Sequence, residues 1–259
     1  MQRRKFLQSS VIAASAITTG LSARATNDKN SVKEMYELRE YNMHFGVDQS
    51  QLETYFRTAL IPAYNKYGVK TIGVFKELSK SEPPKIYLFI PFASMDDYLS
   101  VTAKVKADDE YIKNSQAYNS ITPDKPVYNR YSSSFMIAFD GIPKMVVPAM
   151  TPRIFELRTY ESYSEDAARR KLKMFNEGEF PIFYRTKLNP VFFGEVISGK
   201  NLPCLTYMIT FKDIEERDKN WAAFIADPDW KKLSSDPQYA NTVSNIIKIF
   251  LEPTAYSQV

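Results

Sequence analysis

Two short segments of the chain carry the same three polar residue types at alternate positions. They are Glu37, Arg39 and Tyr41 in the first segment and Glu156, Arg158 and Tyr160 in the second. Alternate residues of a β-strand point to one face, so each segment would present a carboxylate, a guanidinium and a phenol together. This set can form a structural ion pair, or its guanidinium and phenol can hold an acidic or carbonyl-bearing small molecule. All six residues are candidates for ligand binding, and the sequence leaves both roles open.

The strands that would position these residues are 35–43 and 154–162, where apolar and polar residues alternate. We expect Tyr36 and Leu38, with their counterparts in the second strand, to face helices. The polar residues would then line the space between two sheets. A buried charge without a partner costs several kcal/mol, so each arginine in that space needs a carboxylate or a ligand.

Both segments belong to an internal repeat with an offset of 119 residues, the difference between positions 36 and 155. The segments aligned at this offset are 36–41 with 155–160, 61–64 with 180–183, and 107–111 with 226–230. Register that is kept over most of a unit indicates duplication.

Each copy predicts the order β-α-β-β-α-β, which is the ferredoxin-like split βαβ unit. An apolar stripe at helical spacing predicts the first helix, with a kink at Pro62 and at the aligned Pro181. The later elements expected in the first copy are strands at 70–78, 86–92 and 127–138 and helices at 95–106 and from Asp108. In the second copy they are strands at 190–197, 204–211 and 245–251 and helices at 213–225 and from Asp227. We therefore predict an α+β fold made of two ferredoxin-like units fused in tandem.

The repeat and the local composition also predict the domain boundaries. We expect a signal peptide at 1–25, an N-terminal linker at 26–32, a first unit at 33–140, a linker at 141–152 and a second unit at 153–259.

Several of these motifs resemble the NIPSNAP family. They are Tyr36-Glu37-Leu38-Arg39 with Tyr41, Phe155-Glu156-Leu157-Arg158 with Tyr160, and the run 205–211 followed by Trp221, Phe224, Asp227, Pro228 and Trp230. The resemblance implies a dimeric α/β barrel, in which two ferredoxin-like units face their sheets together. Here both units would lie in one chain. The first copy departs from the pattern, because it lacks both tryptophans and has Tyr111 where Trp230 stands.

The resemblance implies more than one class of function. The wider barrel superfamily uses its cavity for oxygenation, isomerisation or haem chemistry, whereas animal NIPSNAP proteins are linked to vesicle traffic and mitochondrial quality control. We expect an exported NIPSNAP-like protein of unassigned activity that binds a small molecule in the inter-sheet cavity. The alternatives are a non-catalytic scaffold or protein-interaction module, and a cofactor-poor oxygenase or isomerase. Binding predicts a cavity of several hundred Å³ beside Arg39, Arg158 and Tyr160, whereas a scaffold predicts a contiguous exposed apolar patch.

Two further residues are weaker candidates. His44, the one histidine, follows the first strand and could act as a general base or a haem ligand, or be a surface group. Glu195 follows Gly194 inside a predicted strand, where a ligand could approach or the strand could simply bulge. No cysteine or histidine cluster indicates a metal. We predict no cofactor, and leave haem or another organic ligand open.

The first 25 residues predict export. Arg3 and Arg4 begin a positive segment that is followed by a mildly apolar stretch and the cleavage pattern at 23–25, as in twin-arginine signal peptides. We therefore predict a periplasmic or otherwise exported protein that uses the twin-arginine machinery. The stretch is too short for a stable membrane span. An uncleaved amphipathic anchor is the alternative.

The charge distribution along the chain limits the kinds of binding partner that can be expected. The four bases of residues 1–25 account for the whole net charge of +4, so the remainder carries 30 bases and 30 acids. A balanced mature protein has no broad basic field for nucleic acid. The lone Cys204 can form no internal disulfide, so stability must come from packing. The expected partner is a small molecule, and a homo-oligomer stays open.

Overall fold

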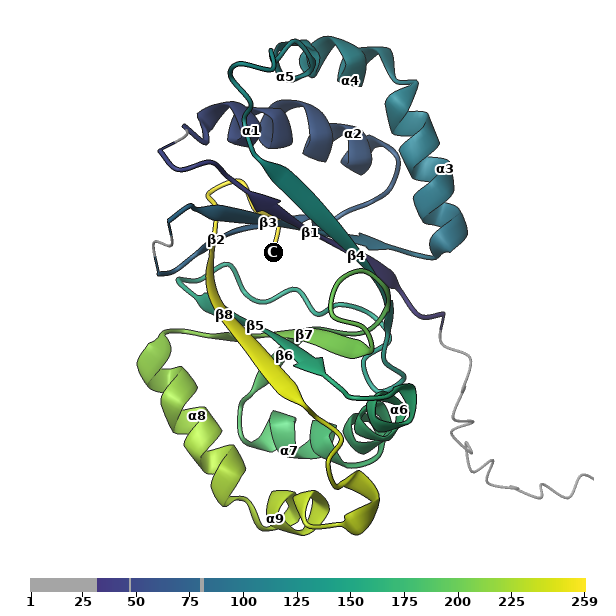
Figure 1. Ribbon diagram of the computed structural model, residues 1–259, viewed down its shortest axis with the longest axis vertical. Coiled ribbons are helices and arrows are strands. Elements are labelled where there is room, and N and C mark those ends of the chain that lie inside the picture. Colours follow the sequence, from purple (N-terminus) through teal and green to yellow (C-terminus); the bar gives the residue numbers. More distant parts are fainter. Residues whose placement is uncertain (1–31, 47, 80–81) are drawn as a thin grey trace, which may run out of the picture. The chain divides into compact units, whose positions relative to one another are not determined.

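The computed structural model describes residues 32–46, 48–79 and 82–259, and the predicted signal peptide lies outside these ranges. Its strands close into one antiparallel barrel in the order β1-β3-β2-β8-β5-β7-β6-β4 (Figure 1). The strands are β1 (Met35–Asn42), β2 (Gly73–Glu77), β3 (Lys85–Phe92), β4 (Arg130–Ala138), β5 (Ile154–Glu161), β6 (Asn189–Ser198), β7 (Cys204–Phe211) and β8 (Asn245–Pro253). The prediction of an α+β barrel is confirmed.

Each half of the chain supplies four neighbouring strands of the barrel. The first half gives the run β4-β1-β3-β2, and the second half gives β8-β5-β7-β6. The two runs join through antiparallel pairing of β2 with β8 and of β4 with β6. The first strand of each half therefore lies inside its own run and pairs on both sides over nearly its whole length.

Helices cover the outside of each run of strands (Figure 1). Those of the first half are α1 (Ser50–Tyr55), η1 (Phe56–Leu60), α2 (Ile61–Lys66), α3 (Met95–Lys106), α4 (Asp109–Asn114) and α5 (Gln116–Asn119). Those of the second half are α6 (Glu165–Met174), η2 (Phe175–Glu179), α7 (Phe180–Arg185), α8 (Ile214–Ala226), α9 (Pro228–Ser234) and η3 (Pro237–Tyr239). Side-chain caps begin the second-half helices, with Ser164 before α6, Asp213 before α8 and Asp227 before α9.

A π-helical turn interrupts the first helix of both halves. These turns, η1 and η2, lie directly before Pro62 and Pro181. Proline has no amide hydrogen and its ring clashes with the preceding turn, so the regular α-helical ladder is broken there. The kink predicted at both prolines takes this form. In the second half the turn ends at Glu179, which is buried.

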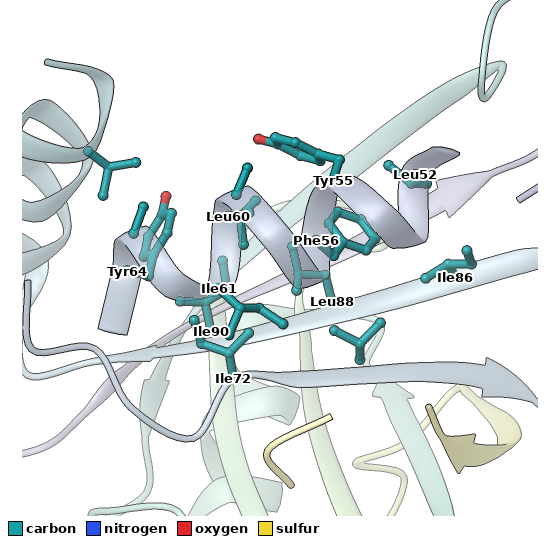
Figure 2. Close-up of a cluster of buried hydrophobic side chains, with 14 of the residues drawn as sticks. Leu52, Tyr55, Phe56, Leu60, Ile61, Tyr64, Ile72, Ile86, Leu88 and Ile90 are labelled. Atoms are coloured by element: carbon teal, nitrogen blue, oxygen red, sulfur yellow. The ribbon is translucent and has the colours of Figure 1, made fainter. Parts of the chain in front are cut away.

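An apolar layer joins the helices of the first half to their strands. Figure 2 shows Phe56, Leu60 and Ile61 from the helix packing toward Leu88 and Ile90 of β3. The corresponding layer of the second half is richer in aromatic rings. Phe193 of β6 stacks on Tyr207 of β7 with ring centroids 4.5 Å apart. These layers position the helices over the outer face of each sheet.

The interior of the barrel is filled by large apolar side chains from both halves. Tyr36 packs against Phe89 and Phe192, and the latter two rings stack with centroids 4.4 Å apart. Phe155 and Leu157 belong to the same buried cluster. An eight-stranded barrel is just wide enough for side chains to fill. This cluster occupies the space in which the polar residues of β1 and β5 were expected.

The sequence-based prediction for the two faces is therefore wrong. Tyr36 and Leu38 face the barrel interior rather than the helices, and so do their counterparts in β5. The candidate residues of both strands face their own helices, not a shared inter-sheet cavity; these are Glu37, Arg39, Tyr41, Glu156, Arg158 and Tyr160. The alternation of apolar and polar residues predicts which residues share one face of a strand. It does not predict which face of the sheet points into the closed barrel. The bulkier apolar set fills the closed barrel, and the ionic set lies under helices whose polar side chains can pair with it.

Candidate functional site

A fully buried carboxylate organises the helix side of the second half. The Glu156 carboxylate accepts a hydrogen bond of 2.9 Å from Arg158 Nη1. It also accepts bonds of 2.9 and 3.0 Å from Arg217 Nε and Nη2, and one of 2.8 Å from Trp221 Nε1. An ionised carboxylate offers about four acceptor sites, so these four bonds saturate Glu156. Because β5 supplies Glu156 and α8 supplies Arg217 and Trp221, the carboxylate fixes α8 over the sheet.

Arg158 has a buried donor that no described residue uses. Its side chain is 7% exposed, yet its Nε has no hydrogen-bond partner among the described residues. The guanidinium carbon lies 4.3 Å from the ring centroid of Trp221 and 5.3 Å from that of Tyr160, which are cation–π distances. Burial lowers the pKa of Arg158, but the neighbouring Tyr207, Tyr160 and Glu156 outweigh it, so the pKa is raised and the group stays charged. A buried polar atom without a partner is costly, and such an atom points to a ligand or a functional role.

A second buried ion pair lies across this site. Lys171 of α6 donates to Glu179 at the end of η2, and both side chains are almost fully buried. The Lys171 ammonium also lies 4.5 Å from the centroid of the Phe175 ring. Burial raises the pKa of Glu179, and the attraction of Lys171 opposes the rise.

Two coupled phenols complete the polar groups of the second half. Tyr207 donates a hydrogen bond of 2.9 Å to the Tyr160 hydroxyl. Burial raises the pKa of both tyrosines, so both are neutral phenols at physiological pH. The pair therefore offers hydroxyl groups for hydrogen bonding, not phenolate charges.

These groups surround a cavity of about 450 Å³ between the sheet and helices α6 to α9. Its polar lining is Arg158, Tyr160, Lys171, Glu179, Arg217 and Lys248, and its apolar lining is Phe183, Trp221, Phe224, Ile225, Trp230, Val243 and Ile246. The volume falls in the range of small-molecule sites, as does the combination of aromatic walls with a few convergent polar groups. We call this space the second-half cavity.

The equivalent site of the first half is built differently. Arg39 grips Glu37 with two bonds, Nε to Oε1 at 2.6 Å and Nη2 to Oε2 at 2.8 Å. Ser133 of β4 adds a bond of 2.7 Å to the same carboxylate. A smaller cavity of about 300 Å³ lies beside them, lined also by Tyr64 and Tyr98. We call it the first-half cavity. Tyr41 lies under the helices and stacks on Tyr131 with ring centroids 4.9 Å apart.

The offset of 119 residues shows where the two cavities differ. At five aligned positions the second half has a charged residue or a tryptophan and the first half has an uncharged residue of another type. The pairs are Leu52 with Lys171, Leu60 with Glu179, Tyr98 with Arg217, Thr102 with Trp221 and Tyr111 with Trp230. All of the charged or indole members line the second-half cavity. Both tryptophan rings are therefore part of the cavity wall.

His44 and Glu195 lie in other hollows. His44 lines an open hollow with Asp48, Gln51 and residues 124–127. Glu195 is exposed and lines a third hollow beside Cys204, at the edge of α6. Neither residue is among those that line the second-half cavity. Gly194 is explained by packing, since a Cβ there would lie 2.7 Å from the Cβ of Met136 on β4.

The described residues contain no group of three or more potential metal ligands among their histidine, cysteine and acidic side chains. Within the same ranges, no helix has both the length and the apolar character needed to cross a bilayer.

Three solved structures share this fold over most of the chain. A Lactobacillus acidophilus protein, provisionally assigned as a monooxygenase, has a TM-score of 0.55 and 11% identity, covering 85% of this chain and 94% of its own. A Fusobacterium nucleatum protein with the same provisional assignment has a TM-score of 0.56 and 12% identity, covering 86% and 93%. An anthrone oxidase-like protein has a TM-score of 0.52 and 9% identity, covering 87% and 93%. At these identities the likeness shows the fold alone, an α+β barrel with helices outside.

The sequence itself carries the family. Residues 155–258 match the NIPSNAP family model, so the second half of the chain is similar to NIPSNAP domains. The resemblance seen in the motifs is confirmed for that half. No functionally curated protein matches the sequence.

Proposed function

We propose that this chain is an exported protein of two ferredoxin-like units that binds a small molecule in the second-half cavity. The unpartnered Nε of Arg158 carries the proposal, because a ligand acceptor would satisfy it. The cavity volume and its aromatic walls support the same conclusion. The likeness of element order in the two halves supports a tandem origin of the units.

Native mass spectrometry of protein purified from its own host tests the binding. We expect a retained small molecule that dissociates on collisional activation and is lost in an Arg158→Met variant. Lys104→Met is the matched control, since Lys104 is an exposed cation on a helix of the first half. Absence of any bound molecule in the unaltered protein would favour the scaffold alternative. The same spectra report the oligomeric state.

The export proposal needs a separate test. Replacing Arg3 and Arg4 by lysine should retain the protein in the cytoplasm if the twin-arginine machinery carries it. Unchanged export of the variant would contradict that route.

A cofactor-poor oxygenase or isomerase is the second candidate function. The monooxygenase and oxidase names of the structural neighbours favour it. The buried ion pair of Lys171 and Glu179 in the cavity wall also favours it, because a carboxyl group with a raised pKa is suited to general acid–base catalysis. Oxygen uptake by the purified protein with a bound ligand would support the oxygenase, and a ligand recovered chemically unchanged would count against catalysis.

A further inference from the structure

We infer that the ligand of the second-half cavity is an anionic aromatic small molecule whose planar carboxylate binds Arg158. This inference rests on the proposed function and adds the chemical class of the ligand. Three observations on the described residues carry it: the geometry of the first-half ion pair, the charge of the cavity wall and the nature of its apolar surface.

The first-half ion pair shows how this arginine position holds a carboxylate. Arg39 uses the edge formed by Nε and Nη2, which matches the two oxygens of Glu37. Arg158 stands at the aligned position, but its own glutamate contacts only Nη1. Glu156 is held in that position by Arg217 and Trp221. The edge that takes a carboxylate in the first half is therefore without one in the second, and a ligand carboxylate would complete it.

The charges around the cavity favour an anion. Four cations line it: Arg158, Lys171, Arg217 and Lys248. Three carboxylates are available to balance them: Glu156 and Asp218 bonded to the arginines, and Glu179 bonded to Lys171. One formal positive charge is left over, that of Lys248, which is exposed and lines the cavity. A cationic ligand would add to this excess, whereas a monoanion neutralises it.

The apolar wall favours an aromatic body. Trp221 and Trp230 flank Phe224, with ring centroids 5.4 and 4.5 Å from it. Aromatic rings gain from offset or edge contacts beyond the area they bury. The Arg158 guanidinium carbon lies over the Trp221 ring, and a bidentate contact would place the ligand carboxylate in the guanidinium plane beside it. A planar acid can then extend from that edge toward the indole rings.

The two tryptophans also provide the test. They are the only ones in the chain and both line this cavity, so the two indole ¹H–¹⁵N signals report directly on it. Three naphthyl probes of similar size are titrated: 2-naphthoate, neutral 2-naphthamide and cationic 2-naphthylmethylammonium. We expect 2-naphthoate to shift both indole signals and to bind at least about tenfold more tightly than the amide, as a charge-assisted bidentate contact provides. The cation should bind most weakly.

Variants of Arg158 test whether the charge of the ligand, and not only its shape, determines binding. Arg158→Met should remove the preference for 2-naphthoate over 2-naphthamide, Arg158→Lys should keep a reduced preference, and the control Lys104→Met should leave it unchanged. A shared circular dichroism spectrum and melting profile would show that the variants fold. Equal binding of all three probes would overturn the inference about charge while leaving the proposed function standing. If no probe shifts the indole signals, the ligand class is wrong, and native mass spectrometry then decides whether a different ligand is present.

Discussion

The two halves of this protein share the same arrangement of strands and helices, but they differ in how the arginine of the first strand is bonded. Both place a glutamate and an arginine two residues apart on the first strand, facing the helices. In the first half, the Nε and Nη2 atoms of Arg39 both donate hydrogen bonds to Glu37, so this edge of the guanidinium is already occupied. In the second half Glu156 is bonded by Arg217 and Trp221, and Arg158, beside a larger cavity, has a donor without a partner in the part of the chain that the structure describes. The comparison teaches that helix residues, not the shared strand motif, decide whether the arginine is structural or available.

The largest expected effect is a difference in stability between the two arginine positions. Arg39→Met leaves the buried Glu37 carboxylate with Ser133 alone, so we expect a loss of about 3–5 kcal/mol in unfolding free energy. Arg158→Met leaves Glu156 with Arg217 and Trp221, so the loss should be about 1–2 kcal/mol. Urea unfolding of both variants measures the difference. Equal losses of unfolding free energy would show that the two ion pairs are equivalent, and this would contradict the proposed difference between the two halves.

The buried Lys171–Glu179 pair should respond to replacement by the residues of the first half. Lys171→Leu leaves Glu179 buried without its cation and should cost about 3 kcal/mol near neutral pH. The double replacement Lys171→Leu with Glu179→Leu restores the pattern of Leu52 and Leu60, and should be neutral or stabilising by about 1–4 kcal/mol. It should also weaken ligand binding. A double variant as unstable as the single one would contradict the assignment of this pair to function.

The pH dependence of the Lys171→Leu variant follows from the direction of the Glu179 shift. Burial raises the pKa of Glu179 above its ordinary value of 4.5, and removal of the lysine raises it further. The folded state then binds a proton more tightly than the unfolded state. Stability is therefore greatest below pH 4.5 and falls as the pH rises through the raised pKa. Unfolding of the variant across pH 4 to 8 should show this fall, and a flat profile would contradict it.

A feature common to both halves should respond in the same way in each. Asp227 caps α9 and accepts two bonds from Arg185, which lower its pKa to about 2. Asp108 caps α4 and accepts a bond from Lys66, which lowers its pKa also. A lowered pKa contributes stability above the ordinary carboxyl pKa, and this is lost as the pH falls through the folded value. Asp227→Asn and Asp108→Asn should each flatten the loss of melting temperature between pH 4 and 2. A response in one half alone would show that the caps have diverged too.

The smallest expected effect concerns one wall of the second-half cavity. Trp230→Tyr installs the residue that the first half has at Tyr111 and keeps an aromatic ring beside Phe224. We expect a stability change within about 1 kcal/mol and less than a tenfold loss of 2-naphthoate affinity. Isothermal titration calorimetry checks the affinity. A loss as large as that of Arg158→Met would mean that the indole, not the guanidinium, dominates binding.

The sequence predicted the framework better than the site. Spacing and the internal offset located the strands and both interrupted helices, because these depend on periodicity and proline chemistry within short segments. The closed barrel was expected only from the resemblance to the NIPSNAP family. The orientation of β1 and β5 was reversed, because alternation is symmetric and a closed barrel selects the bulkier apolar face for its interior. His44 was a candidate because it is the one histidine of the chain, and Glu195 was a candidate because it follows Gly194. Neither residue lines the second-half cavity.

The residues that the sequence analysis missed lie on helices. Lys171, Glu179 and Arg217 come from α6, η2 and α8, and only the fold brings them to the strand residues. One signal for them was present in the sequence. The aligned positions of the first half hold Leu52, Leu60 and Tyr98, so charged side chains of the second half stand where the first half has uncharged ones. Such mismatches between copies identify a specialised half more directly than the motif that both copies share.

The most direct test of the central claim is a crystal structure of the protein with 2-naphthoate. The two-cavity comparison predicts the ligand in the second-half cavity, with its carboxylate in the plane of the Arg158 guanidinium and its rings against Trp221 and Trp230. Naphthoate inside the barrel, beside Arg39, or with its carboxylate turned to solvent would contradict the claim that the second half alone has freed its arginine for a ligand.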